Sequence, residues 1–150
     1  MQVGTVVLCD TASLRFAQAL NAAGFDVHGV THHGANWVAE CSVSMLKSAL
    51  SEPAVLIADS ENCDLLPSVG WARRSAHKPV GAYVLINPTT TPQHRGLGDG
   101  DWPDAPVIVL SNGGGTDEQR AAVMQARLRG WTVINYTDSP VEHIIGALHS

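Results

Sequence analysis

Short apolar runs alternate with amphipathic stretches of helical length along the whole chain. The apolar runs are rich in Val, Leu and Ile, which is typical of strands that are buried on both faces of a sheet. Six runs are expected to form strands, namely Gly4–Cys9, Phe25–Val30, Ala54–Ala58, Gly81–Ile86, Pro106–Leu110 and Trp131–Tyr136. This alternation predicts a three-layer, doubly wound α/β domain with a mostly parallel six-stranded sheet.

Helix-start signals support the same reading near the C-terminus. Thr116 and Gln119 have the spacing of a capping box, in which two side chains satisfy the free backbone N–H groups of a helix start. Ser139 and Glu142 have the same spacing, and Pro140 fits the first helical position. We expect one helix to begin after each signal.

One long segment, from Asn87 to Ala105, breaks the alternation. It is rich in Pro, Gly, Thr and Asp, and it is longer than the usual connection inside a compact domain. A functional lid and a mobile excursion are the two interpretations. The glycines at 96, 98 and 100 indicate mobility and so favour the lid-like interpretation.

Composition and charge exclude two partner classes. The chain has 150 residues, 45% hydrophobic and 15% charged, which fits a single domain over residues 1–150. Nine Lys and Arg against fourteen Asp and Glu give a net charge of −5, too little positive charge to follow a nucleic-acid backbone. No apolar stretch reaches the roughly 18 residues of a membrane helix. We therefore expect neither nucleic acid nor a membrane as a partner.

The cysteines and the N-terminus indicate a compartment. Cys9, Cys41 and Cys63 are odd in number and widely spaced, which argues against a disulfide framework. The first ten residues have neither the basic region nor the cleavage site of a signal peptide. The prediction is a cytoplasmic protein with free thiols.

Polar residues follow the predicted strands, where ligands bind in open α/β sheets. Ser60 is the most informative, because it follows the strand Ala54–Ala58 and precedes a helix. This places its hydroxyl at the tip of a tight turn, near backbone N–H groups that polarise a carbonyl. The alternative interpretation is a serine that caps the helix.

These residues resemble the core of the α/β-hydrolase superfamily. The resemblance runs from the strand TVVLCD through VLIADSENCDLLPSV, VGAYVLINP and DWPDAPVIVLSNGGGTDEQ to RGWTVINY, in the family's element order. The long loop lies where the family inserts its lid. The family's nucleophile elbow, G-x-S-x-G, corresponds here to Ala58-Asp59-Ser60-Glu61-Asn62.

The resemblance implies roles for several residues. Ser60 would be the nucleophile, and the oxyanion hole would use the N–H of Glu61 and the segment that ends at Thr11. An acid at Asp10 in that segment is expected to point toward the oxyanion and oppose the chemistry. Asp117 would be the triad acid, with Asn112 as a weaker candidate, although Asp117 also suits a helix start.

The histidine of the triad departs from the family pattern. The family places it between the sixth strand and the last helix, where residues 137–140 contain no histidine. His143, His32 and His33 are the candidates to replace it as the base that a serine nucleophile requires. A binding cleft at the same edge would be formed by His32, Trp37, Asn87, Trp102 and Asn112.

Other ligand sites have weaker signals. Asp10 and Asp59 suit a receiver-like phosphoacceptor, but a receiver has a second acid after its first strand and a lysine after its last. The loop Asn112–Thr116 suits an anion-binding nest, but it lacks the lysine of a P-loop. His28, His32 and His33 lack a further ligand at metal-site spacing, so no metal and no cofactor is predicted.

Two functions remain open. In the first, Ser60 hydrolyses or transfers a small ester or thioester acyl group. In the second, the domain is an inactive pseudo-hydrolase that binds a small molecule or a protein partner. Because a truncated core leaves sheet edges uncovered, we also expect a homodimer.

Overall fold

Six parallel strands form one sheet in the order β2-β1-β3-β4-β5-β6. They are β1 (Thr5–Leu8), β2 (Val27–Gly29), β3 (Ala54–Asp59), β4 (Ala82–Ile86), β5 (Val107–Ser111) and β6 (Thr132–Asn135). This is a computed structural model, and it describes residues 1–30, 37–89 and 105–150, without the side chains of Trp37 and Leu65. The predicted sheet is confirmed, and every strand pair is parallel.

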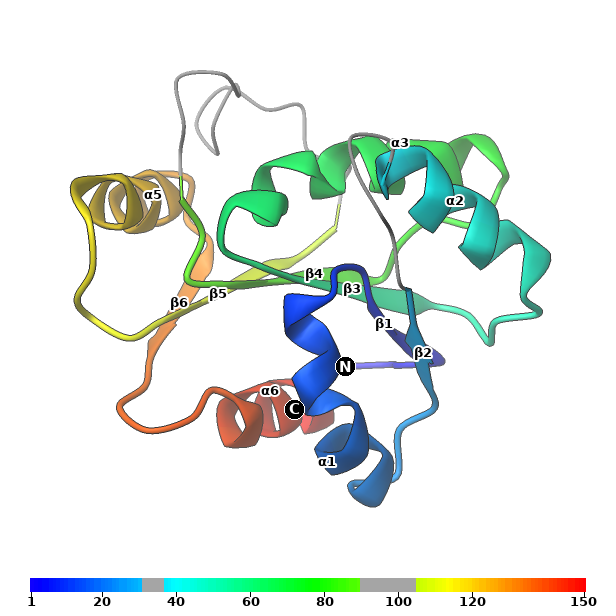
Figure 1. The fold of residues 1–150 in the computed structure, drawn as a ribbon, viewed down its shortest axis with the longest axis horizontal. Helices are drawn as coiled ribbons and strands as arrows, with labels where there is room; N and C mark the ends of the chain where they lie inside the picture. Colours follow the sequence, from blue (N-terminus) through cyan, green and yellow to red (C-terminus); the bar gives the residue numbers. More distant parts are fainter. Residues whose placement is uncertain (31–36, 90–104) are drawn as a thin grey trace.

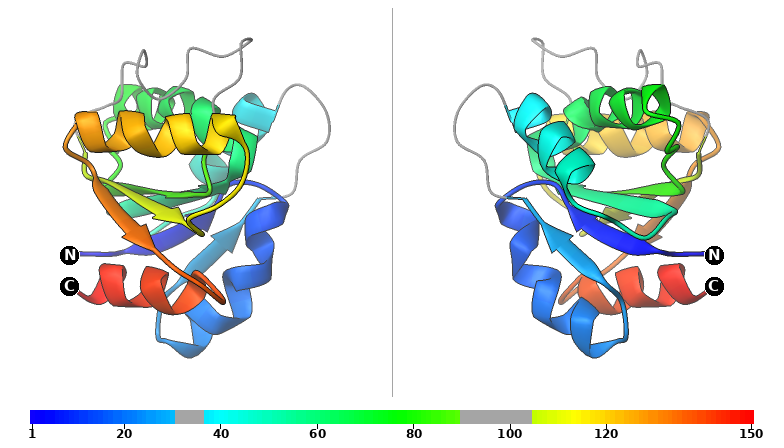
Figure 2. Two further views of the ribbon diagram at one scale, coloured as in Figure 1. Left: turned by 90° about the vertical axis from the view of Figure 1, so that its left-hand side faces the viewer. Right: turned by 90° about the vertical axis from the view of Figure 1, so that its right-hand side faces the viewer.

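Helices cover both faces of the sheet (Figure 1). One face carries η1 (Ala12–Phe16), α1 (Ala17–Ala22) and α6 (Val141–His149), and the other carries α2 (Trp37–Lys47), η2 (Ser60–Leu65), α3 (Leu66–Ser75) and α5 (Asp117–Leu128). The side views show these two layers, with α1 and α6 on one side of the strands and the other helices opposite (Figure 2).

The core is divided by the sheet into two clusters. One cluster joins β3, β4 and β5 to α2, α3 and α5 through residues such as Leu56, Met45 and Ala122. The other joins the opposite side chains of the same strands to α1 and α6, for example through Leu20 and Ile144. Because both faces are covered, every residue of β1, β3, β4 and β5 is buried, which explains their uninterrupted apolar runs.

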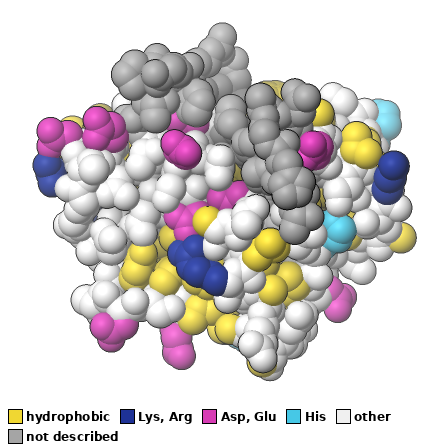
Figure 3. Space-filling view, in the orientation of Figure 1, with side chains coloured by type: hydrophobic (Ala, Val, Ile, Leu, Met, Phe, Trp, Pro, Cys, Tyr) yellow, Lys and Arg dark blue, Asp and Glu magenta, His cyan; other side chains and the backbone are white. Residues whose placement is uncertain are grey.

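The two edge strands are less buried than the central ones. β2 and β6 contain exposed and half-buried residues, and each pairs with one neighbour only. The predicted homodimer, which rests on such edges, stays a prediction. None of the described helices is long and apolar enough to cross a membrane. On the face drawn in Figure 3, scattered acidic side chains predominate over basic ones, consistent with the negative net charge.

The predicted helix starts have different outcomes. The capping box of Thr116 and Gln119 is present at the start of α5, with both of its hydrogen bonds. The second capping box is wrong, because α6 begins at Val141 with Pro140 as its N-cap and no side-chain cap. Ser139 instead accepts a long hydrogen bond from the Val141 N–H, at 3.4 Å.

The strand register places four strand ends at one level. Asp59 at the end of β3 lies beside Ile86, and Ser111 at the end of β5 lies beside Asn135. The next residues continue the pattern, since the N–H of Asn87 donates to the carbonyl of Leu110. Residues that follow these strands are therefore brought to the same edge of the sheet.

Candidate active site

The candidate site lies where the winding of the sheet reverses, between β1 and β3. The chain leaves β1 toward β2 on one side and returns to β3 on the other, so the carboxyl ends of β1 and β3 flank a topological switch point. Ligands bind at such points in open α/β sheets, because the flanking loops separate there. Asp10 follows β1, while Asp59 and Ser60 follow each other at the end of β3.

Ser60 occupies a strained turn. Its φ angle is +54°, in the left-handed region that residues other than glycine rarely adopt. The turn connects β3 directly to η2, and Ser60 is only partly buried. Such strain costs about 1–3 kcal/mol and is concentrated at functional sites. The predicted sharp turn with a serine at its tip is therefore present.

The Asp10 side chain stabilises this turn through hydrogen bonds to residues on both sides of Ser60. Its carboxylate is fully buried and accepts three hydrogen bonds, one from Ser13 N at 3.1 Å, one from Asp59 N at 3.0 Å and one from Asn62 Nδ2 at 3.1 Å. The expectation that Asp10 opposes an oxyanion is wrong in its geometry, because these three donors already occupy both carboxylate oxygens. The hydrogen bond from Asn62 Nδ2 to Asp10 gives the asparagine at the last position of the elbow a structural role.

The Ser60 hydroxyl faces a carboxylate. Its Oγ–H donates to Asp59 Oδ1 at 2.8 Å, and Asp59 Oδ2 forms an ion pair with Arg15 at 2.7 Å. Asp59 is 8% exposed at its side chain, whereas Arg15 is 49% exposed. Arg15 also donates to the Ala12 carbonyl and lies over the Phe16 ring. The serine is thus linked through Asp59 to a guanidinium at the surface.

A buried thiol lies under the same turn. Cys63 is fully buried and donates to the Ala58 carbonyl at 3.4 Å. Burial raises the pKa of the Cys63 thiol well above its usual range, and the nearby Asp10 and Asp59 carboxylates raise it further. The thiol therefore stays neutral, and all three cysteines are free and buried.

A second polar cluster joins the ends of β4, β5 and β6. Asn87, at a φ of +46°, donates from Nδ2 to the Tyr136 hydroxyl. Its Oδ1 accepts from the Asn112 N–H at 3.0 Å. The two asparagines predicted to line a cleft, Asn87 and Asn112, are therefore in contact. The contact uses the Asn87 side-chain oxygen and the Asn112 backbone N–H, which bond to each other.

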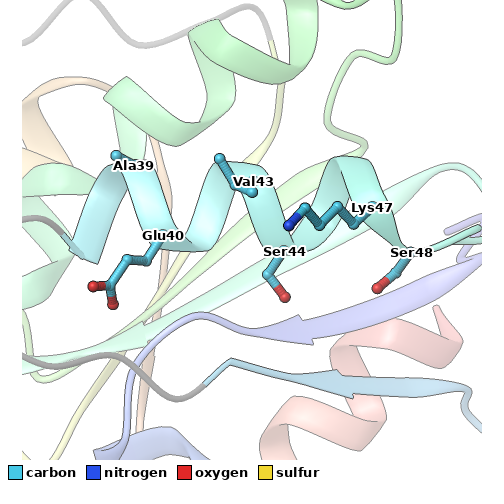
Figure 4. Close-up of a pocket in the computed structure, with 6 residues that line it drawn as sticks. All are labelled: Ala39, Glu40, Val43, Ser44, Lys47 and Ser48. Atoms are coloured by element: carbon cyan, nitrogen blue, oxygen red, sulfur yellow. The ribbon is translucent and has the colours of Figure 1, made fainter.

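A hollow of about 390 Å³ lies beside this edge, between η1 and α1 on one side and the β6–α6 connection on the other. Its lining residues are Arg15, Phe16, Ala19, Tyr136, Asp138, Ser139, Pro140 and Val141. Arg15 joins this hollow to Asp59 and Ser60, and Tyr136 joins it to Asn87. A larger hollow, of about 560 Å³, is lined among the described residues by α2 and by Ser48 directly after it, with Glu40, Ser44 and Lys47 along it (Figure 4), and these lining residues include none of those just described.

The predicted acid Asp117 and the candidate base His143 lie on α5 and α6, not on the turn that carries Ser60. Asp117 is 92% exposed at its side chain and pairs with Arg120 within α5. His143 is exposed on α6, whose buried face carries Ile144 and Leu148. Glu61 and Thr11 are exposed at the starts of η2 and η1, beside the turn. His32, His33 and Trp102, the Trp37 side chain and most of the lid-like loop lie outside the described residues.

Histidine does not contact Ser60 in the part of the chain that the structure describes. His28 Nε2 lies 3.0 Å from Ser44 Oγ, and burial lowers the pKa of His28. His149 stacks on Phe25. His77 and His143 are exposed. Over the same ranges no group of His, Cys, Asp and Glu has the arrangement of a metal site.

Comparison with known proteins identifies the fold. No protein-family model and no curated protein matches the chain. Among solved structures, it is similar to a protein from Xanthomonas campestris pv. campestris that is described as a putative hydrolase of the alpha/beta superfamily. The TM-score is 0.63 at 14% identity, covering 97% of this chain and 95% of the other. The chain has an α/β-hydrolase-like fold. The resemblance stated from the residues is thereby confirmed at the level of fold.

Two residues of this α/β-hydrolase-like edge, Arg15 and Tyr136, were not singled out from the sequence as site residues, and Asp59 was considered only for a receiver-like phosphoacceptor. Arg15 lies on a helix far from Ser60 in the chain, and Tyr136 ends a strand, so neither has a local signal. Asp59 had one, because a carboxylate beside a turn serine is within reach of its hydroxyl. Its pairing with Arg15 depends on the packing of η1 against β3.

Proposed function

We propose that this α/β-hydrolase-like protein binds a small acyl compound at the edge beside Ser60 and does not hydrolyse it through a histidine-activated serine. The observation that carries the proposal is the state of the Ser60 hydroxyl. Its hydrogen is donated to Asp59, whose other oxygen is paired with Arg15. The protein would then be a pseudo-hydrolase, a binding module that keeps the fold.

The Asp59 carboxylate is a poor substitute for histidine. A general base must take the hydroxyl proton as the bond to the acyl carbon forms, and it works best when its pKa is close to the operating pH. Both Asp59 oxygens are already engaged, Oδ1 by the Ser60 hydroxyl and Oδ2 by the Arg15 guanidinium. An unactivated serine loses several orders of magnitude in rate. Asp59 is better suited to orient the hydroxyl for binding.

The adjoining hollow suits an acyl compound. Phe16, Ala19 and Val141 supply apolar surface for a short chain, while Arg15 and Tyr136 supply donors for a carbonyl or carboxylate oxygen. Pockets that bind small molecules combine an apolar lining with a few converging polar groups. Within the described part of the chain, Arg15 and Asp59 link the hollow to Ser60, so the ligand's polar end would lie at Arg15.

The alternative function, a serine hydrolase or acyltransferase, is favoured by one observation. Ser60 retains the left-handed conformation that exposes a nucleophile at a strand-to-helix turn. In that case the base would be His32 or His33, and the N–H of Glu61 would supply one oxyanion donor. Asp117 and His143 are less suited, given the positions described above.

Fluorophosphonate labelling separates the two functions. Intact mass is measured for the wild type and for Ser60→Ala after treatment, and we expect no adduct on either folded protein. An adduct that is present on the wild type and absent from Ser60→Ala would overturn the proposal and assign a serine enzyme.

Ligand binding is tested separately with butyrate and methyl butyrate as probes. We expect backbone amide shifts at Arg15, Tyr136 and Ser139 in two-dimensional NMR spectra of both the wild type and Ser60→Ala. The shifts should be lost in Arg15→Gln and kept in Arg74→Gln, a matched removal of a surface charge elsewhere. If neither probe shifts these amides, the chain does not bind acyl compounds in this hollow.

A further inference from the structure

Another hollow lies on the α5 side of the sheet, at the ends of β5 and β6. Its volume is about 370 Å³, and it is lined by residues of α5, of the two strand ends and of the glycine-rich turn after β5. It is separate from the hollow beside Arg15, which lies under η1 and α6 and shares no lining residue with it.

The floor of this hollow changes from apolar to polar at the strand ends. Val109 and Val133 belong to the core cluster under α5. Ser111 and Asn135 lie two residues after these valines on their strands, so their side chains point to the same face of the sheet as the valines, because side chains alternate along a strand. Ser111 and Asn135 also lie opposite each other in the strand register. Ser111 Oγ accepts the Gly113 N–H at 3.1 Å, which leaves its own hydrogen for a ligand.

The wall of the hollow carries two arginines on one side of α5. Arg120 and Arg127 are seven residues apart, which is about two helical turns and hence the same face. The Arg120 guanidinium is held in place by the Gly115 carbonyl and the Asp117 carboxylate. Within the described ranges, the Arg127 guanidinium has neither an ion pair nor a hydrogen bond. It is therefore available to an incoming group.

The charge balance distinguishes this hollow from the other two. The α2 hollow has both Lys47 and Glu40 among its lining residues, and the hollow beside Ser60 has both Arg15 and Asp138. Among the described residues that line it, the α5 hollow has two arginines and no acid; Asp117 beside it pairs with Arg120, so Arg127 supplies the uncompensated charge in a chain whose net charge is −5. Its positive charge is therefore a local feature that the composition does not predict.

The glycine-rich turn leaves room at the mouth. A Cβ atom placed on Gly113 or Gly114 would meet nothing within 4 Å, so the backbone borders open space. Gly113 has a φ of +79°. Because these two residues have no side chain, a ligand can approach the main chain closely here.

We propose that this hollow binds a small phosphate-bearing anion, such as a phosphate monoester. Guanidinium groups match the oxygens of phosphate in a two-pronged geometry, and the Asn135 amide and the Ser111 hydroxyl add neutral donors. The site lies at the carboxyl ends of two parallel strands, where α/β sheets place their ligands. It is independent of the function proposed for Ser60.

The test is a titration of the whole ¹⁵N-labelled chain with inorganic phosphate at constant ionic strength, followed by NMR. We expect saturable shifts of the amides of Gly113, Gly114 and Asn135. Arg127→Gln should weaken phosphate binding about tenfold, because a charge-assisted hydrogen bond contributes roughly that factor. Arg74→Gln, which removes an equal charge from α3, and Ser60→Ala should each retain wild-type affinity.

Three results would overturn the proposal. The first is the absence of saturable shifts in the wild type. The second is an equal loss of affinity in Arg127→Gln and Arg74→Gln, which would indicate attraction by overall charge alone. The third is equal binding of acetate, which would assign a carboxylate ligand in place of a phosphate. The amide spectrum of each variant verifies that it is folded.

Discussion

Replacing Asp10 with Ala should destabilise the protein far more than an ordinary loss of a side chain. The substitution removes the acceptor for Ser13 N, Asp59 N and Asn62 Nδ2 at once. Ser13 and Asp59 are 0% and 6% exposed, so water does not readily replace the lost acceptor for their backbone N–H groups. Asn62 is less buried and can turn its amide toward solvent.

The magnitude follows from these two buried donors. Each buried donor left without an acceptor costs about 1–3 kcal/mol, so for two donors we expect Asp10→Ala to lower the free energy of unfolding by about 2–6 kcal/mol. The total free energy of unfolding of a domain of this size is about 5–15 kcal/mol. Asp10→Asn keeps one acceptor oxygen and nearly the same volume, and it should cost less.

Urea unfolding followed by circular dichroism measures the effect. The midpoint should fall while the slope with denaturant stays constant, which indicates that stability alone has changed. Asp117→Ala is the control, because that exposed carboxylate should contribute within about 0.5 kcal/mol. If Asp10→Ala and Asp117→Ala prove equally mild, Asp10 does not hold the turn and the role assigned to it is wrong.

Two further predictions concern backbone strain and pH. Ser60→Gly should be more stable than Ser60→Ala by about 1 kcal/mol, since only Gly adopts a φ of +54° without strain; equal stability would argue against strain at the turn. Because burial lowers the pKa of His28, the unfolded chain binds more protons than the folded one as the pH falls through about 6.5. Stability should therefore decline below that pH, and less steeply in His28→Gln, in urea unfolding at about pH 7.5 and about pH 5.5; parallel pH dependences would exclude His28 as the cause.

The strands of the sheet and the position of the turn at Ser60 could be predicted from the residues alone. Apolar runs covered on both faces appear as continuous strands, and Thr116 with Gln119 marks a helix start, because these signals act between residues a few positions apart. Ser60 was found for the same reason, since a strand that ends abruptly before a helix leaves a sharp turn.

The contacts between the residues of the site depend on how the strands are ordered in space. Asp10 is 49 residues from Asp59 and 52 from Asn62, and Asn87 is 49 residues from Tyr136. Such contacts arise from the strand order, which places β1 beside β3 and the ends of β4, β5 and β6 at one level. Periodicity reports which face of an element is buried, but it does not report which elements are neighbours. The sequence therefore predicted that Asp10 would oppose an oxyanion, whereas in the folded protein its carboxylate binds Asp59 and Asn62 and stabilises the turn.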